Sequence, residues 1–514
     1  MINDLEPQEL TALVIETEES LKDGVVDEPP TNSSFATKVR NFIEKQDIEF
    51  AVDKAKKPFA RVKINEHFEI FSVESQPFKD YLLEILENTF KTVIPVTTLD
   101  TALSSISSKA RRSNTTKVVA VRVYFDTGVN KIYLDLCNNN WETIEIDSSG
   151  WRVCNDCPIW FQRFDDMDKI PKPCTVSNTV ESLHKLKKFI NYTTEDNFDL
   201  IVCWLLSNLL SDIGTPLLVL QGSQGVGKSL SSEFLRSIFD PAKQLKSTAL
   251  AKKSADIIIQ VSQSRVTVYD NLSSKALTPE ISDLLCCIAT NSASARRSLY
   301  TNSDLTIFKL GASLILNGID ELATRADLLD RSIIINLEPV SNRERETVLR
   351  TNFEQERAEI TGALLNIISY SLAHIEDSNF KSNLFRFTDL GTIMDAASPA
   401  LGWNPNHFKN IVEQNMKTSN KSLAQSSYLV MGIVGILEEQ STLDGKPSHI
   451  LAKIKNYYNE IGETLPPKAL PTPNTLKGQL KRHKKTLEQF NISYSSENAR
   501  ANSTIYRISK LDDD

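Results

Sequence analysis

Eight consecutive residues form the segment of this sequence whose residue types and spacing most directly predict chemistry. The segment reads Gly222-Ser223-Gln224-Gly225-Val226-Gly227-Lys228-Ser229 and matches the phosphate-loop pattern G-x-x-x-x-G-K-[ST] at every fixed position. Glycines let backbone N–H groups turn toward phosphate oxygens, and a following helix adds positive potential at its N-terminus. We expect Lys228 to reach the β- and γ-phosphates of ATP and Ser229 to hold Mg²⁺. The motif therefore predicts a binding site for ATP and magnesium.

Two further polar residues stand directly after apolar runs, where buried strands are expected to end. Asp270 follows the run Arg265–Tyr269, and an aspartate at this place is the expected partner of the metal ion. Asn317 follows Ala312–Leu316, and its side chain is expected to sense the γ-phosphate or to orient water. Both residues are candidates for the catalytic machinery.

The catalytic base stays open at this stage. Asn271 stands where many ATPases carry a second carboxylate that polarises the attacking water. Another acid, such as Asp320 or Glu321, is one alternative, and slow hydrolysis is the other.

Two arginines precede the next apolar run, Ser332–Leu337. An arginine at this place is positioned to meet the γ-phosphate of a neighbouring subunit and to neutralise charge in the transition state. Arg331 is the first candidate and Arg325 the second. The alternative is an ion pair within the chain to Asp327 or Asp330.

The elements that must position these residues follow the pattern of a parallel sheet. Apolar runs of strand length alternate with helical patterns from residue 215 onward, and the run Pro216–Leu220 leads directly into the phosphate loop. Residues 229–239 continue as an amphipathic helix. The predicted fold class is α/β, with a phosphate-loop core built on a parallel sheet.

Changes of pattern divide the rest of the chain. Residues 1–35 hold nine acidic residues and one lysine, and residues 117–165 alternate apolar and polar positions as half-buried strands do. The predicted segments are an acidic mobile arm (1–35), an α+β N-terminal domain of unknown role (36–177), a helical collar or linker (178–214), the ATPase core (215–345), a helical segment (346–427) and a winged-helix-like domain (428–514).

The last segment carries a local excess of positive charge. Residues 471–510 contain eight basic and two acidic residues, a net charge of +6. The order of a basic helix starting at Leu476 and a two-stranded hairpin is that of a winged helix, whose basic helix enters the major groove of DNA. The alternative is a protein-binding winged helix with a solvated basic face. His483 lies on the same basic face and is expected to be exposed and not to be a ligand. The candidate DNA-binding residues are Lys477, Lys481, Arg482, Lys484, Lys485, Arg500 and Arg507.

Four of the seven cysteines are close in sequence, namely Cys137, Cys154, Cys157 and Cys174. The spacing of Cys154 and Cys157 is that of zinc ligands, but no second pair of this spacing follows. Whether these thiols bind zinc is left open, and reduced, partly buried thiols are the favoured interpretation.

Composition excludes several classes of protein. Hydrophobic residues make up 40% and charged residues 24% of the chain, as in ordinary soluble proteins, and the net charge of −8 argues against a uniformly basic coat protein. The longest apolar stretch, Leu200–Leu210, is about half the ~20 residues that span a bilayer. We expect a cytoplasmic protein without membrane association.

The motifs from the phosphate loop onward resemble a known group of proteins. The segments Tyr269-Asp-Asn-Leu, Leu316-Asn-Gly-Ile-Asp and Asp327-Leu-Leu-Asp-Arg331 resemble those of ATP-binding proteins of bacterial mobile elements and phages, which are similar to superfamily 3 helicases and viral primase–helicases of the AAA+ class. The resemblance is strong over residues 215–340 and implies a ring, with a hexamer favoured, that binds ATP between subunits. It also implies a DNA-facing hairpin between the second and third strands, for which Arg296 and Arg297 are the matching candidates.

The resemblance implies an ATP-dependent helicase or translocase that acts on single-stranded or forked DNA, with replication partners, in a mobile element. Asn271 favours a rival, a DNA-bound ATP switch that loads or regulates without unwinding. A nucleotide-sensing defence effector is a further alternative, and a small-molecule kinase is disfavoured because no lid or substrate pocket is recognisable.

Overall fold

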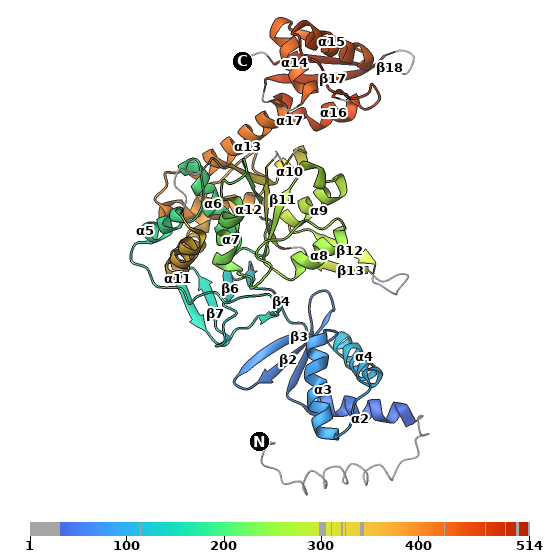
Figure 1. The fold of residues 1–514 in the computed structure, drawn as a ribbon, viewed down its shortest axis with the longest axis vertical. Helices are drawn as coiled ribbons and strands as arrows, with labels where there is room; N and C mark the ends of the chain where they lie inside the picture. The colour runs from blue at the N-terminus through green and yellow to red at the C-terminus, as the bar shows by residue number, and fades with distance from the viewer. Residues whose placement is uncertain are drawn as a thin grey trace. The chain divides into compact units, whose positions relative to one another are not determined.

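The computed structural model (Figure 1) describes two compact units, Met1–Lys117 and Val118–Asp514. The boundary lies inside segment 36–177, which the sequence analysis treats as one domain. Asp320, Glu321, Arg500 and nearly all of the acidic arm lie outside the described residues, and for Arg296, Arg297 and Lys485 only the backbone is described. The described residues are 31–113, 115–297, 305–309, 311–319, 322–323, 325–339, 344–425, 427–467, 469–488, 490–499 and 503–511.

The first unit is a small antiparallel sheet covered by helices. Its sheet has the order β1-β2-β3, and apolar residues of the sheet, including Ala60 and Val62, pack against Phe78 and Leu82 of α3. The unit contains both helices and strands. The elements are α2 (Thr31–Lys45), β1 (Ile48–Val52), β2 (Pro58–Ile64), β3 (His67–Ser72), α3 (Gln76–Phe90) and α4 (Val96–Arg112).

The second unit begins with the strands that the alternating pattern of residues 117–165 predicts. Four of them form an antiparallel sheet, β5-β6-β7-β8, and the other two pair in parallel. This sheet shares one hydrophobic core with the phosphate-loop segment, so it is not a separate N-terminal domain. The strands are β4 (Val119–Ala120), β5 (Val123–Asp126), β6 (Lys131–Asp135), β7 (Thr143–Asp147), β8 (Gly150–Cys154) and β9 (Trp160–Phe161).

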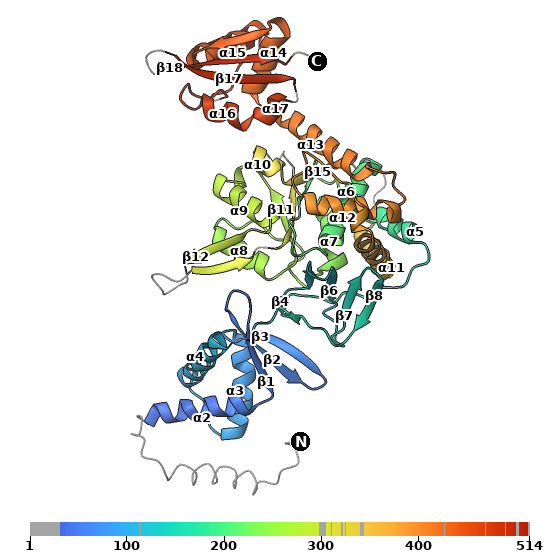
Figure 2. The ribbon, with the colours of Figure 1, turned by 180° about the vertical axis from the view of Figure 1, so that it is seen from behind.

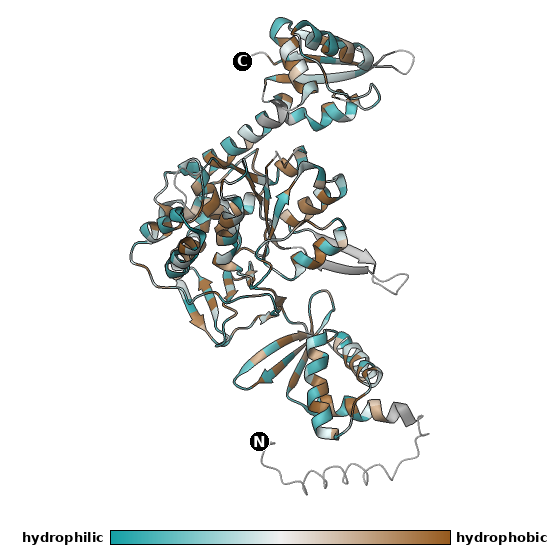
Figure 3. Ribbon diagram, in the orientation of Figure 1, coloured by the Kyte–Doolittle hydropathy of each residue, from teal (hydrophilic) through white to brown (hydrophobic). Residues whose placement is uncertain are grey.

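A four-stranded parallel sheet forms the centre of the second unit. Its order is β11-β14-β10-β15, so the strand that leads into the phosphate loop lies between two neighbours. The predicted parallel sheet is confirmed, and its strands are buried except near their carboxyl ends, because helices cover both faces. Figure 3 shows hydrophobic residues, in brown, on both the strands and the helices of this unit. The strands are β10 (Leu217–Gln221), β11 (Val266–Leu272), β14 (Ser313–Gly318) and β15 (Ser332–Asn336).

Helices surround this sheet. The longest, α11, packs against β7 and β8 of the antiparallel sheet (Figure 2) and joins the two sheets. Trp151 Nε1 on β8 donates to Asn366 Oδ1 on α11 at 2.9 Å. The helices are α5 (Thr179–His184), α6 (Glu195–Ser207), α7 (Lys228–Phe239), α8 (Ser254–Ser262), α9 (Pro279–Ala289), α10 (Ala326–Leu329), α11 (Glu346–Ala373), α12 (Thr388–Ala397) and α13 (His407–Gln425).

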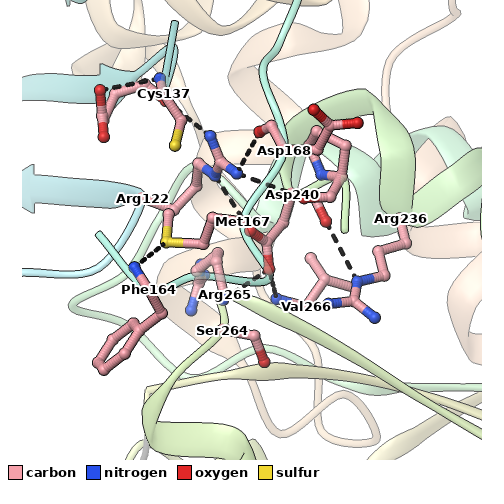
Figure 4. Close-up of polar contacts among 12 residues, drawn as sticks. Arg122, Cys137, Phe164, Met167, Asp168, Arg236, Asp240, Ser264, Arg265 and Val266 are labelled. Carbon is pink, nitrogen blue, oxygen red and sulfur yellow. Dashed lines mark hydrogen bonds and ion pairs between the residues drawn. The ribbon is translucent and has the colours of Figure 1, made fainter. Parts of the chain in front are cut away.

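A buried ionic network anchors the phosphate-loop helix α7 at its C-terminal end (Figure 4). Asp240 follows α7 and is 1% exposed, and it pairs with the fully buried Arg122 at 3.0 Å. Its other oxygen accepts the backbone N–H groups of Arg265 and Val266, at 2.8 and 2.9 Å. One carboxylate thus holds together α7, the start of β11 and the segment before β5.

The C-terminal part has a hydrophobic core of its own, formed by residues that include Leu429, Ile450 and Ile508. The basic helix predicted from Leu476 is broken at His483 into two short helices, which corrects the single helix of the sequence analysis. The predicted hairpin is confirmed, and β16 joins it in a sheet of order β16-β18-β17. The elements are α14 (Tyr428–Glu439), β16 (Thr442–Gly445), α15 (Pro447–Glu460), α16 (Leu476–Arg482), α17 (Lys484–Glu488), β17 (Ile492–Ala499) and β18 (Ser503–Lys510).

Candidate functional site

The phosphate-loop motif connects β10 to α7, as predicted. Gly222, Gly225 and Gly227 have φ values of +149°, +83° and +83°, which L side chains rarely adopt. A Cβ atom at Gly222 would also collide with the backbone carbonyl oxygen of Leu337. The glycines are therefore required by the backbone path of the loop and by its close approach to the chain after β15.

Lys228 is the first residue of α7, and its side chain folds back over the loop. The ammonium group donates to the carbonyl oxygens of Gly222 at 2.7 Å and of Ser223 at 2.8 Å. Burial lowers the pKa of Lys228, and the negative charge of Asp270 acts in the opposite direction. A cation held over a phosphate loop at a helix N-terminus is suited to bind the phosphates of a nucleotide.

Asp270 lies at the carboxyl end of the sheet on β11, and this strand is separated from β10 by β14. The pairing of β11 with β14 becomes irregular between Tyr269 and Leu272, and Asn271 has a φ of +54°. Asn271 N–H donates to Asp270 Oδ1 at 2.9 Å, and the Asn271 side chain is exposed. The hydroxyl of Ser229 and the carboxylate of Asp270 are hard oxygen donors, a ligand type that Mg²⁺ prefers.

Asn317 is fully buried at the end of β14 and is linked to the loop helix. Its Nδ2 donates to Ser232 Oγ at 2.8 Å, and Ser232 Oγ donates to the carbonyl oxygen of Ser229 at 2.9 Å. Asn317 Oδ1 has no hydrogen-bond partner. The side chain therefore connects the third predicted strand to the turn of α7 that carries Ser229.

The two candidate arginines have different surroundings. Arg325 donates to both carboxylate oxygens of Asp327, at 3.0 and 2.7 Å, and pairs with Asp283 at 2.7 Å. This is the intrachain ion pair that the sequence analysis kept as the alternative. Arg331 is half-buried, and its Nη1 donates to the backbone carbonyl of Asp327 at 2.6 Å. Of the two, Arg325 is therefore the arginine that carboxylates of its own chain hold in place.

A β-hairpin lies between β11 and β14, in the place that the family resemblance implies. It is formed by β12 (Ala293–Arg297) and β13 (Leu305–Lys309), and Figure 1 shows it extending away from the parallel sheet. Arg296 and Arg297 lie opposite Thr306 and Leu305 in the strand pairing. Both candidate DNA-facing arginines therefore lie at the end of the hairpin that is farthest from the parallel sheet.

The basic side chains of the C-terminal part lie on its surface where they are described. Lys477, Lys481, Arg482 and Lys484 are exposed, whereas Leu480 and Leu487 of the same helices are buried. Arg507 on β18 is also exposed and lies 3.6 Å from Asp444 on β16. His483 is half-buried between the two helices rather than exposed, which corrects the sequence analysis.

The four clustered cysteines, Cys137, Cys154, Cys157 and Cys174, are free thiols in the structure. Among the described residues, no group of ligand atoms close enough for a metal includes a cysteine, and Asp196, Asp199 and His407 form the group that does come together. Burial raises the pKa of Cys157 to about 12, so its thiol stays protonated near neutral pH.

Asn191 also contacts the phosphate loop, and sequence reasoning missed it. Its side chain donates to the carbonyl oxygen of Val226 at 2.9 Å. Asn191 precedes α6 and belongs to no motif, so no local signal distinguishes it from other polar residues before a helix. Only its position in the folded chain identifies it.

Comparison with known proteins adds the family. Residues 182–404 match the family model described as actinomycete integrative conjugative element replication protein, and residues 429–513 match the model of the AICE RepA C-terminal domain. No protein of curated function matches the sequence. No helix among the described residues is long and apolar enough to cross a membrane.

Solved structures of low overall similarity also match. One is Cch of SCCmec type IV, an active helicase, with 13% identity, a TM-score of 0.42, and coverage of 84% of this chain and 89% of that chain. Another is the apo C-terminal region of NrS-1, with 12% identity and a TM-score of 0.39. The match covers 92% of this chain and 99% of that chain.

Proposed function

Residues 182–404 and 429–513 belong to the replication-protein family of actinomycete integrative conjugative elements, and from this premise we propose a function. The chain is an ATP-dependent DNA motor that acts in the replication of such an element. The observation that carries the proposal is the loop between β10 and α7, with the ammonium group of Lys228 folded back over it and Asp270 at the carboxyl end of the same sheet. This arrangement supports ATP binding and hydrolysis by an AAA+ phosphate-loop core.

The proposed roles of the residues follow from their places. The loop 222–229 holds the phosphates, and Ser229 and Asp270 hold Mg²⁺, which neutralises charge on the phosphate oxygens when bound. Asn317 orients water or senses the γ-phosphate through its link to the turn of Ser229. Arg331, with Arg325 as the second candidate, meets the γ-phosphate of a neighbouring subunit in a ring, for which we favour a hexamer.

The DNA-binding roles belong to two other parts. The hairpin with Arg296 and Arg297 contacts single-stranded or forked DNA, and ATP turnover moves it. We assign the C-terminal part to a winged-helix domain. The chain order of α14, β16, α15, α16–α17, β17 and β18 supports this assignment. Its exposed basic residues bind DNA phosphates, and replication partners join the motor there or at the N-terminal unit.

The proposal is tested by ATP hydrolysis with and without single-stranded DNA, using the full chain and Lys228→Ala as the blank. We expect DNA to stimulate hydrolysis and the variant to lose both the basal and the stimulated rate. A strand-displacement assay on forked DNA then tests unwinding. A purified chain that stays monomeric with ATP and DNA together would contradict the ring and the role of Arg331.

A specific observation favours a second function. Asn271 offers an exposed amide, not a carboxylate, next to Asp270. A DNA-bound ATP switch, which loads or regulates without unwinding, needs only slow turnover. Tight ATP binding with little hydrolysis, unchanged by DNA, would support the switch and contradict the motor. A nucleotide-sensing effector in defence would likewise show no stimulation by DNA, and it would also lack specific DNA binding.

A further inference from the structure

Asn191 lies between α5 and α6 and joins three elements around the phosphate loop. Its Nδ2 donates to the carbonyl oxygen of Val226 in the loop at 2.9 Å and to that of Glu338 after β15 at 2.8 Å. Its backbone N–H donates to Ser231 Oγ on α7 at 3.1 Å. One residue of the helical segment before the sheet is therefore hydrogen-bonded to the loop, to the loop helix and to the chain after the edge strand.

The chemistry of a phosphate loop explains why this contact matters. When the N–H groups of a loop face an anion, its carbonyl groups must find donors elsewhere in the protein. Val226 is fully buried, so water does not serve its carbonyl oxygen. A carboxamide has two N–H bonds on one nitrogen and can serve two carbonyl oxygens at once. Asn191 uses this capacity on Val226 and Glu338.

A neighbouring residue makes a similar contact that does not involve the loop. Thr193 Oγ1 donates to the carbonyl oxygen of Asn336, the last residue of β15, at 2.5 Å. Gln221 Nε2 donates to the side-chain oxygen of the same asparagine at 2.8 Å. Thr193 therefore attaches the same segment to the edge strand, whereas Asn191 attaches it to the loop as well.

We propose that Asn191 is a positioning residue of the nucleotide site. It fixes the carbonyl group of Val226 and thereby the direction of the loop N–H groups that bind phosphate. The inference rests on the proposed binding of ATP by this loop and adds a residue from outside the motif to that site. Because the contact is made to the loop, its loss affects every ligand that binds through phosphates, whatever its base.

The test compares three variants of the full chain. Asn191→Asp keeps the shape of the side chain and replaces the donating nitrogen by an acceptor, Asn191→Ala removes the donor without adding charge, and Thr193→Val is the matched control. Calorimetry measures binding of ATP–Mg²⁺ and of tripolyphosphate–Mg²⁺, which has no base, at a temperature where thermal unfolding shows all chains folded. We expect both Asn191 variants to lose affinity for both ligands by about 10-fold, and Thr193→Val to change it by less than about 2-fold.

The outcomes separate this inference from the proposed function. If the wild-type chain binds ATP and both Asn191 variants bind both ligands as Thr193→Val does, the inference is wrong and the proposed function stands. Loss of ATP binding with unchanged tripolyphosphate binding also contradicts it, because the residue would then act on the nucleoside. If the wild-type chain binds neither ligand, while Lys228→Ala behaves identically, the proposed function fails and the inference with it. A purely structural role would lower the unfolding temperature without changing the affinity of the folded chain.

Discussion

Asn271 occupies the residue position next to Asp270 with a left-handed backbone and an exposed side chain. Asparagine and aspartate both tolerate this conformation, so Asn271→Asp introduces a carboxylate with little strain. If the missing carboxylate limits hydrolysis, the variant raises kcat for ATP by about 10-fold, a modest share of what a well-placed general base supplies. The affinity for ATP is expected to stay the same. Steady-state hydrolysis and equilibrium binding measure the two quantities, and an unchanged kcat would remove Asn271 as the cause of slow turnover.

The loop glycines offer a second comparison at this scale. Gly222→Ala places a methyl group against the carbonyl of Leu337 at a φ of +149°, and we expect a loss of about 2–4 kcal/mol in the free energy of unfolding. Gly227→Ala meets open space at a φ of +83° and is expected to cost about 1–2 kcal/mol from backbone strain alone. Denaturant unfolding of both variants checks the order, and equal losses would show that the contact with Leu337 is not limiting.

At the scale of elements, the C-terminal basic segment shows how one residue divides a helix. His483 ends α16, and α17 starts at the next residue. Burial first, and the positive charge of Arg482 second, lower the pKa of His483 below its usual 6.5. The break divides the basic residues of the predicted helix between two short helices. The imidazole ring of His483, which is neutral near pH 7, lies between them.

This environment predicts a pH dependence of stability in the C-terminal part. Because the pKa of His483 is lower in the folded chain than in the unfolded chain, the unfolded chain binds the proton more readily. The stabilisation is therefore complete above about pH 6.5 and is lost as the pH falls toward the folded pKa. Hydrogen exchange of amides in residues 428–511, corrected for its intrinsic pH dependence, measures the effect. His483→Gln should abolish the acid sensitivity that His483 causes. The control is His449→Gln, which changes an exposed histidine of the C-terminal part and should leave this acid sensitivity unchanged.

At the scale of the whole second unit, the Arg122–Asp240 pair joins the antiparallel sheet to the parallel sheet (Figure 4). Arg122→Met leaves Asp240 buried without its charged partner, and we expect a loss of about 3–5 kcal/mol in the free energy of unfolding. The double variant Arg122→Met/Asp240→Asn should lose less than the sum of the single losses, because no uncompensated charge remains. Calorimetric unfolding of the four chains measures the coupling.

An exposed ion pair of the same unit serves as the control. Lys172 pairs with Glu142 at 2.9 Å, and the lysine side chain is 60% exposed. Lys172→Met should change the free energy of unfolding by less than about 1 kcal/mol. A loss in Arg122→Met as small as in this control would contradict the anchoring role of the buried network.

The sequence by itself determined the parts of the site that depend on neighbouring residues. A phosphate loop is specified by glycine, lysine and serine at fixed spacing between an apolar run and an amphipathic helix, and each of these signals is local. The same holds for the strand ends with Asp270 and Asn317 and for the alternating strands near residues 117–165. The parallel sheet followed from this order because strands of one direction need helical crossovers.

Only the tertiary structure decided which distant segments complete the site. Asn191 reaches Val226 and Glu338, and Arg122 reaches Asp240, across separations of 35, 147 and 118 residues. Such contacts arise when buried carbonyl and carboxylate groups find the donors that the packed core brings near, and no local pattern encodes that choice. The same packing assigned the antiparallel strands to the core of the parallel sheet and split the basic helix at His483, because shared burial, not sequence order, determines where these elements belong.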